Sequence, residues 1–396
     1  MSSFETTAER VTKAGAPTDQ ALPGLAVMVA DDTGAIRYSK AFGSSSKGPV
    51  TVDSTFWIAS CTKLLTTVAV LQCVERGLLN LDDPVESLLP ELANLDILYG
   101  FDENTGAPLL KKAKNKITMR HLLTHSSGLG YDMMHPDLIR WRKFHGQEQT
   151  SRPDLTIAEC AYPLLFEPGE GFVYGVSIDW AGRAVERLNN NIRLGEYFQK
   201  HIWEPLGMWR STFTPSEHPV VRENLIDMVL RTPDGLQPIP HPLGATPPVD
   251  EAGGAGMFSS VSDYIKVLVS LLKNDGKLLK PESVDQMFQP QLPDPKYLHE
   301  VLQHPDINRG MTMGIQAGKQ WNWGLGGLLA MEETPGRRSK GTLSWSGMPN
   351  PAWWIDRTRK TCGMMGIQLL PFFDHAAISL YGELEALAWE KFSTTA

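Results

Sequence analysis

The chain has 396 residues and a formal net charge of −8 at pH 7, and 42% of its residues are hydrophobic. This length and composition allow a large core, in one big domain or in two intertwined ones. The mild acidity gives no reason to expect nucleic acid or an anionic membrane as partner, and no apolar run is long enough to cross a bilayer.

The N-terminus and the cysteines indicate a reducing compartment. The first residues, MSSFETTAERVTKAGAP, lack the apolar core of a secretory signal. Four cysteines lie far apart and without metal-type spacing, namely Cys61, Cys73, Cys160 and Cys362. We therefore expect free thiols and a cytoplasmic protein.

The N-terminal part predicts a short helix, a hairpin and a long helix. Residues 5–15 favour the short helix, and Gly24–Gly43 has two β-rich runs around the turn sequence DDTG. The long helix begins at Ser60, continues with apolar residues at helical spacing, and ends at Gly77.

The middle of the chain, through about Pro248, is rich in proline and glycine and predicts loops and short helices. Its clear helical patterns are Thr118–Thr124, Ile178–Leu188 and Leu194–Ile202.

The C-terminal part predicts a helix, three strands and a final helix. Phe258–Gly276 reads as an amphipathic helix with a Ser/Asp-rich start and a glycine stop. The expected strands and final helix are Gly341–Met348, Pro351–Thr358, Thr361–Leu370 and residues 374–391.

Strands at both ends with helices between them predict an α+β fold. Its antiparallel sheet would come from both chain ends and be flanked by helices. We expect residues 1–95 and 250–396 to form an α/β sheet domain and residues 96–249 a mostly helical insertion, with an active site in the cleft between them.

Ser60 and Lys63 are the first candidate catalytic residues. Residues three apart on a helix share a face, so the hydroxyl and the amine can point into one space. The partial positive charge of a helix N-terminus favours an alkoxide there. The alternative is an N-cap serine followed by a lysine that reaches solvent, and S-x-x-K alone occurs often by chance.

The surrounding motifs decide between these interpretations. The S-x-x-K motif after Phe56-Trp57-Ile58-Ala59 resembles the nucleophile motif of the class C β-lactamase and penicillin-binding-protein family, which includes the family VIII carboxylesterases. Further matches follow in the family's order, over about residues 20–370: HLLTHSSGL from His121, Tyr174 after Pro168-Gly169, GGAGMFSSVSDYIKVL from Gly253, and Trp345-Ser346-Gly347. The resemblance implies a β-lactamase/transpeptidase-like fold.

A narrower resemblance points to a group within this family. The stretches ASCTKLLTT, KITMRHLLTHSSGLGY, YGVSIDWAGRAVER and DYIKVLVSLLKNDGKLL are similar to the fungal acyltransferases of lovastatin biosynthesis, which transfer a 2-methylbutyryl group. They also resemble relatives that hydrolyse the same kind of ester. The resemblance implies a hydrophobic, statin-like polyketide ester as substrate.

The resemblance also implies roles for individual residues. Ser60 would be the nucleophile, and Tyr174 would be the general base and acid while Lys63 holds the network, although these last two roles could be exchanged. The backbone N–H groups of Ser60 and Met348 would form the oxyanion hole. A core tyrosine with a satisfied hydroxyl is the alternative for Tyr174.

Two departures from the family pattern bear on the substrate. Many β-lactamases have Lys-Thr-Gly where this chain has Trp345-Ser346-Gly347, and an indole cannot pair with a substrate carboxylate. No asparagine follows Tyr174 in the second motif. Both departures disfavour β-lactamase or peptidase activity and favour an apolar or bulky ester.

Aromatic residues near the motifs are candidates for an apolar substrate site. The predicted substrate-binding residues are Tyr131, Trp345, Ser346, Gly347, Phe372 and Trp57, with Trp353 and Trp354 as further candidates. Core packing is the alternative for each aromatic side chain.

Other constellations predict no second chemistry. His121 and His125 have helical spacing but no glutamate of an H-E-x-x-H motif, so they are interpreted as structural, and we expect no metal or organic cofactor. A non-catalytic binding protein would have lost Ser60, Lys63 or Tyr174, and all three are present.

The leading hypothesis is a serine carboxylic-ester hydrolase. The alternative is an acyltransferase, which would need an acyl carrier or an acyl thioester as donor. Hydrolysis is favoured because it needs no second protein and no donor.

Overall fold

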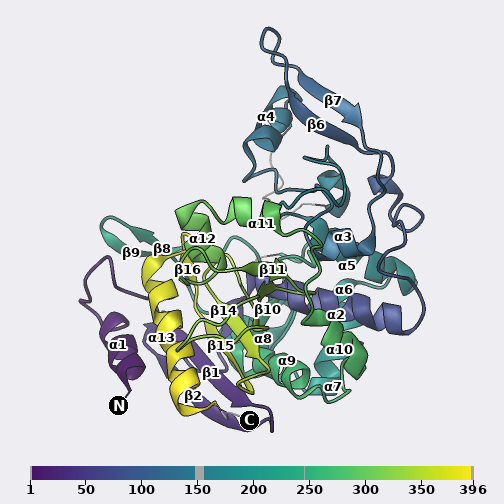
Figure 1. The fold of residues 1–396 in the computed structure, drawn as a ribbon. Coiled ribbons are helices and arrows are strands. Elements are labelled where there is room, and N and C mark those ends of the chain that lie inside the picture. The colour runs from purple at the N-terminus through teal and green to yellow at the C-terminus, as the bar shows by residue number, and fades with distance from the viewer. Residues whose placement is uncertain (1, 148–155, 245, 394–396) are drawn as a thin grey trace.

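The computed structural model describes residues 2–147, 156–244 and 246–393. Its centre is an antiparallel sheet in which the strand order is β11-β12-β13-β14-β15-β1-β2 (Figure 1). The two N-terminal strands are β1 (Leu25–Asp31) and β2 (Ile36–Phe42). The others are β11 (Trp321–Trp323), β12 (Leu328–Ala330), β13 (Leu343–Ser346), β14 (Ala352–Asp356) and β15 (Thr361–Gly366). The predicted sheet from both chain ends is confirmed.

Both faces of the central strands are buried, and β1 shows how the sequence achieves this. Its residues alternate between the two faces because successive side chains in a strand point to opposite sides. Ala26, Met28 and Ala30 belong to the main core, and Leu25, Val27 and Val29 belong to a second core. An all-apolar strand of this kind needs cover on both sides.

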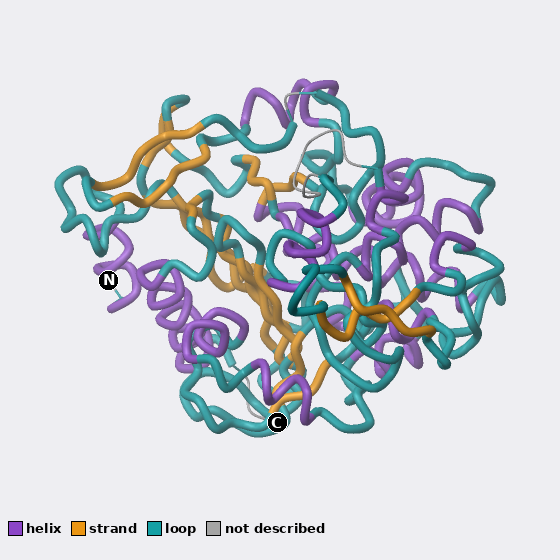
Figure 2. Tube along the Cα trace, turned by 90° about the horizontal axis from the view of Figure 1, so that it is seen from above, coloured by secondary structure: helices purple, strands orange, loops and turns teal. Residues whose placement is uncertain are grey.

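Helices provide that cover (Figure 2). The second core lies under α1 (Ser3–Val11) and α13 (His375–Lys391), which contact each other. On the opposite face α9 (Val261–Lys273) contacts β1, β14 and β15. There α2 (Thr62–Glu75) packs against α5 (Ser177–Leu188) in the main core.

The middle of the chain contains the predicted short helices and also strands that were not predicted. The hairpin of β6 (Asp96–Phe101) and β7 (Pro108–Lys112) projects from the body beside α4 (Pro136–Phe144) (Figure 1). A second hairpin, β8 (Met228–Thr232) and β9 (Gly235–Ile239), pairs in parallel with β16 (Leu369–Leu370). Helices thus dominate this part of the chain, and the two hairpins add strands to it.

The remaining elements are short. Their bounds are β3 (Ser44–Ser45), β4 (Gly48–Pro49), β5 (Thr55–Trp57), β10 (Phe258–Ser260), α3 (Met119–Leu123), α6 (Leu194–Phe198), α7 (Glu204–Leu206), α8 (Pro219–Asn224), α10 (Pro281–Met287), α11 (Lys296–Val301) and α12 (Pro305–Met311).

The helix predicted over Phe258–Gly276 is real but begins later. Its first three residues form β10, which pairs with β5, so tertiary pairing overrides the local pattern there. Ser260 then caps α9 by accepting a hydrogen bond from the Asp263 N–H at 3.2 Å. The left-handed residue Asn274 ends the helix, two residues before the predicted glycine.

The structure also bears on the state of the cysteines and on membrane-spanning helices. Cys61, Cys73, Cys160 and Cys362 are free and buried, as expected. Among the described residues, no helix has both the length and the apolarity needed to span a membrane.

Candidate active site

Ser60 lies in a short 3-10 helix, Ala59–Cys61, that leads directly into α2. Ala59 has a φ of +42°, a strained conformation for a residue with a β-carbon. The Thr62 hydroxyl stabilises the turn by donating to the Ala59 carbonyl at 2.6 Å and accepting from the Met257 N–H at 3.2 Å. The Ser60 side chain is partly exposed, so a substrate can reach it.

Lys63 is buried in the first turn of α2, and its ammonium group has three acceptors. Nζ donates to the Gly254 carbonyl at 2.7 Å, to the Ser60 hydroxyl at 3.1 Å and to the Tyr131 hydroxyl at 3.1 Å. These bonds use all three donors of a protonated lysine. The alternative that Lys63 reaches solvent is wrong, because the side chain is only 2% exposed.

The charge state of Lys63 follows from its surroundings. Burial alone would lower the pKa of Lys63, but the oxygens of Tyr131, Tyr174 and Asp179 outweigh it and raise that pKa. His125 lies nearby with its ring 4.5 Å from that of Tyr174. Burial and the Lys63 charge hold the pKa of His125 well below its usual value. Lys63 is therefore the cation of the site, and His125 is neutral.

Tyr174 precedes α5 and lies over the same ammonium. Lys63 Nζ is 4.6 Å from the centre of its ring. The Tyr174 hydroxyl oxygen accepts a hydrogen bond from the indole N–H of Trp345 at 3.0 Å. A donor and a nearby cation both stabilise negative charge on this oxygen. Trp345, predicted as a substrate-binding residue, is 5% exposed and directly contacts Tyr174.

Tyr131 brings a second phenol to Lys63. Its ring is 5.7 Å from that of Tyr174, and a bond of 2.8 Å between the Ser127 and Ser177 hydroxyls joins the segments that carry the two tyrosines. Burial raises the pKa of Tyr131 more than the Lys63 charge lowers it. Tyr131 is therefore the neutral phenol at the edge of the site.

The end of β13 packs closely against the segment that leads into Ser60, and Gly347 allows this close approach. A β-carbon on Gly347 would lie 2.3 Å from the Ile58 carbonyl oxygen, so a larger residue cannot occupy this position without movement. Its N–H donates to the Pro351 carbonyl at 2.8 Å. The following residue, Met348, is 37% exposed beside this contact. This placement is compatible with the predicted oxyanion role of Met348.

The other predicted substrate-binding residues lie in different surroundings. Ser346 is partly buried at the end of β13. Phe372 is 41% exposed on a loop that Asn350 holds by donating to the Leu369 and Pro371 carbonyls. Trp57 is buried, and its indole N–H donates to the Ala255 carbonyl at 2.6 Å, which gives it a packing role.

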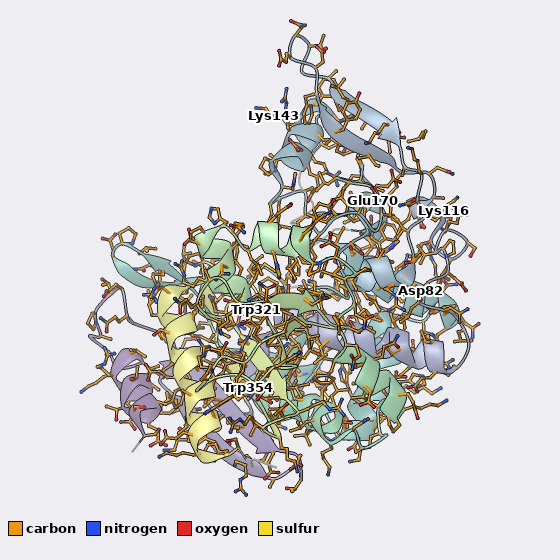
Figure 3. All side chains as sticks on the ribbon, in the orientation of Figure 1. Asp82, Lys116, Lys143, Glu170, Trp321 and Trp354 are labelled. Carbon is orange, nitrogen blue, oxygen red and sulfur yellow. The ribbon has the colours of Figure 1, made fainter. Side chains whose placement is uncertain are left out.

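Trp353 is the cross-strand neighbour of Trp345, whereas Trp354 lies on the other face of β14. They are buried in the two cores on opposite faces of β14. Trp354 lies beside α13 with its ring 5.8 Å from that of Tyr381 (Figure 3). Pattern alone does not distinguish a buried sheet tryptophan from one that lines a pocket.

Asp179 and Gly254 belong to the site and were not predicted as functional. Asp179 lies in the first turn of α5, and Oδ1 accepts from the Gly254 N–H at 2.8 Å. The carbonyl of the same glycine is the closest acceptor of Lys63. The sequence did contain a signal for Asp179. It lies five residues after Tyr174, on the face of an amphipathic helix that is expected to be buried.

The histidines carry no metal arrangement. The His121 ring accepts from the Thr118 N–H at 3.3 Å and so helps to cap α3. Within the described parts of the chain, no three histidine, cysteine or acidic side chains are grouped as metal ligands.

The comparison with family models decides the family to which this chain belongs. The model described as Beta-lactamase matches residues 7–383, nearly the whole chain. The chain belongs to the beta-lactamase family. The name refers to common ancestry and fold, and members of the family need not cleave β-lactams.

Relatives within the beta-lactamase family are close over most of the chain. Lovastatin esterase from Penicillium rubens is 38% identical over 354 residues, which are 87% of this chain and 88% of that protein. Monacolin J acid methylbutanoyltransferase from Aspergillus terreus is 38% identical over 369 residues, covering 89% and 88%. A solved structure of a simvastatin synthase mutant from Aspergillus terreus has a TM-score of 0.88 at 36% identity and covers 98% and 96%. The predicted fold and family are confirmed.

Proposed function

We propose that this protein is a serine carboxylic-ester hydrolase that forms an acyl-enzyme on Ser60. The observation that carries the proposal is the saturated ammonium of Lys63, which touches the Ser60 hydroxyl while its other two donors are already used. A protonated lysine cannot accept the serine proton. The neighbouring oxygen that can do so is that of Tyr174, which the Trp345 N–H and the Lys63 charge stabilise as an anion.

The proposed reaction has two steps. Tyr174 takes the Ser60 proton as the serine oxygen attacks the ester carbonyl, and the N–H groups of Ser60 and Met348 stabilise the oxyanion. The intermediate collapses, and the leaving alcohol takes the proton back from Tyr174. Water then attacks the acyl-enzyme, with Tyr174 again as base and acid, and releases the carboxylic acid and free Ser60.

The substrate class rests on the site and on the relatives together. Trp345 in the third motif offers no cation for a substrate carboxylate, which disfavours β-lactams and peptides. Two relatives of 38% identity are a lovastatin esterase and a methylbutanoyltransferase. We infer that the substrate is the acyl side-chain ester of a hydrophobic polyketide-type metabolite.

Acyl transfer is the second candidate, and it uses the same acyl-enzyme. An alcohol of the acceptor metabolite would replace water, and an acyl carrier or acyl thioester would supply the acyl group. The esterase and the transferase relatives are equally similar to this chain, so identity does not separate the two reactions. The two reactions differ in whether water or an acceptor alcohol reaches the acyl-enzyme.

Intact-protein mass spectrometry tests the proposal. The protein is incubated with lovastatin, with and without added deacylated alcohol, and a Ser60→Ala variant is the control. Free 2-methylbutyric acid formed in water alone supports hydrolysis. An adduct on Ser60 that disappears only when alcohol is added supports transfer. Absence of any adduct or product contradicts the substrate class, and an active Ser60→Ala variant contradicts the mechanism.

A further inference from the structure

The environment of Lys63 contains one carboxylate. The titratable groups that act on Lys63 from the surrounding elements are Cys61, His125, Tyr131, Tyr174 and Asp179. Of these groups, which all belong to the described part of the chain, only Asp179 is a carboxylic acid. It is 7% exposed and sits on α5, the helix that packs against α2.

A single residue joins Asp179 to Lys63. The Asp179 carboxylate accepts the Gly254 N–H at 2.8 Å, and the Gly254 carbonyl accepts Lys63 Nζ at 2.7 Å. A β-carbon on Gly254 would lie 2.5 Å from Asp179 Oδ2, so the carboxylate packs directly on the glycine backbone. Thr66 fixes the same turn by donating to the Gly253 carbonyl at 2.6 Å.

We propose that Asp179 is a positioning residue for the reaction: through the Gly254 backbone and through its charge, it orients Lys63 and keeps it an ammonium ion. This inference rests on the proposed function. A buried cation without a counter-ion is expensive, and a buried lysine then loses its proton. Asp179 prevents this and so reserves the role of base for Tyr174.

The electrostatic consequence has a definite sign. Burial raises the pKa of Asp179, whereas Lys63 and the Gly254 N–H oppose that rise. Lys63 must keep its proton for this arrangement to work, so loss of that proton sets the alkaline limb of the rate profile. The Asp179 charge raises the pKa of Lys63, so removing it lowers that pKa and shifts the alkaline limb to lower pH.

The test compares substitutions of two residues, Asp179 and Thr66, that contact the Gly253-Gly254 turn from neighbouring helices. Asp179→Asn keeps an acceptor for Gly254 but removes the charge. Thr66→Val loosens the same turn and leaves the charge in place. We measure kcat/KM for a short-chain nitrophenyl ester as a function of pH, with Tm as a check of folding. We expect the alkaline limb of Asp179→Asn to move down by about 1–3 pH units. The alkaline limb of Thr66→Val stays where the wild type has it.

The outcomes separate this inference from the proposed function. An alkaline limb that stays in place in Asp179→Asn, even at a reduced rate, overturns the positioning role, and so does an equal shift in Thr66→Val. If Asp179→Asn does not fold, Gly254→Ala displaces the carboxylate and shifts the alkaline limb in the same direction by less. A wild type without Ser60-dependent ester cleavage contradicts the proposed function instead.

Discussion

Two phenols contact the Lys63 ammonium region, and mutation can distinguish their roles. Tyr174 accepts from Trp345, whereas Tyr131 accepts from Lys63. Tyr174→Phe removes the proposed base, and we expect kcat to fall by about two to four orders of magnitude. Tyr131→Phe removes one acceptor of Lys63, and we expect about a tenfold loss. Steady-state kinetics on an ester substrate measures both, and equal losses would contradict the assignment.

The hydrogen bond from the Trp345 indole N–H to Tyr174 can be tested separately. Trp345→Phe keeps an aromatic ring but removes the donor to Tyr174, and a hydrogen bond to a charged oxygen is worth about 1.5–3 kcal/mol. We expect kcat to fall about 10- to 100-fold. Trp321 (labelled in Figure 3) gives the matched control Trp321→Phe, because its buried indole N–H has no acceptor among the described residues. A similar loss in both variants would show that packing alone matters.

The sequence identified Ser60, Lys63 and Tyr174 because their motifs are local. Asp179 and the true contact of Trp345 were missed because their partners are distant in the chain. Gly254 lies 75 positions from Asp179, and Tyr174 lies 171 positions from Trp345. Spacing on one helix predicts a shared face, but it carries no information about a contact between elements.

At the scale of elements, the end of β13 meets the 3-10 helix of Ser60 at Gly347. Gly347→Ala places a β-carbon against the Ile58 carbonyl, so the strand end must move away from the nucleophile segment. We expect the protein to fold and kcat to fall by at least about tenfold, because small displacements in an oxyanion site are costly. Circular dichroism and ester kinetics measure the two effects.

Gly341→Ala is the control for this prediction. Gly341 has a positive φ of +86°, and a β-carbon there would meet open space. We expect this change to lower stability without lowering kcat. Reduced kcat in both variants, or in neither, would contradict the special role of Gly347.

The predicted elements agree best with the structure where the hydrophobic pattern extends over many residues. The hairpin of β1 and β2, the helix α5 and the C-terminal strands β13 to β15 were expected within a few residues. The short strands β11 and β12 were not, because three residues show no alternation and owe their conformation to pairing with neighbours. The start of α2 was placed two residues early, because the strained 3-10 helix leaves no sequence pattern.

At the scale of the whole molecule, a buried ion cluster joins α13 to the loop before β13. Glu385 accepts from Arg338 Nε at 2.6 Å and also from Arg337, and the side chains of Glu385 and Arg338 are fully buried. Glu385→Gln leaves two guanidinium groups without their counter-ion. We expect a loss of about 3–5 kcal/mol in the free energy of unfolding, measured by urea denaturation.

Asp294→Asn is the comparison for Glu385. Asp294 pairs with Lys296 on the surface, where both side chains are more than half exposed. Solvent screens such a pair, so we expect no measurable change in stability. Equal effects of the two substitutions would show that the buried cluster contributes no more to stability than a surface ion pair.

The strand order has a consequence for synthesis on the ribosome. Strand β1 lies between β2 and β15, and its pairing with β15 joins Ala26 to Gly366. The nascent chain therefore carries Ser60 and Lys63 long before Trp345 and Gly347 exist. Until residues 361–366 emerge, one edge of β1 has no strand to pair with, and such an edge can pair with other chains. A chain released before residue 345 is added therefore lacks both Trp345 and the β15 partner of β1, so we expect it to be inactive and prone to aggregate.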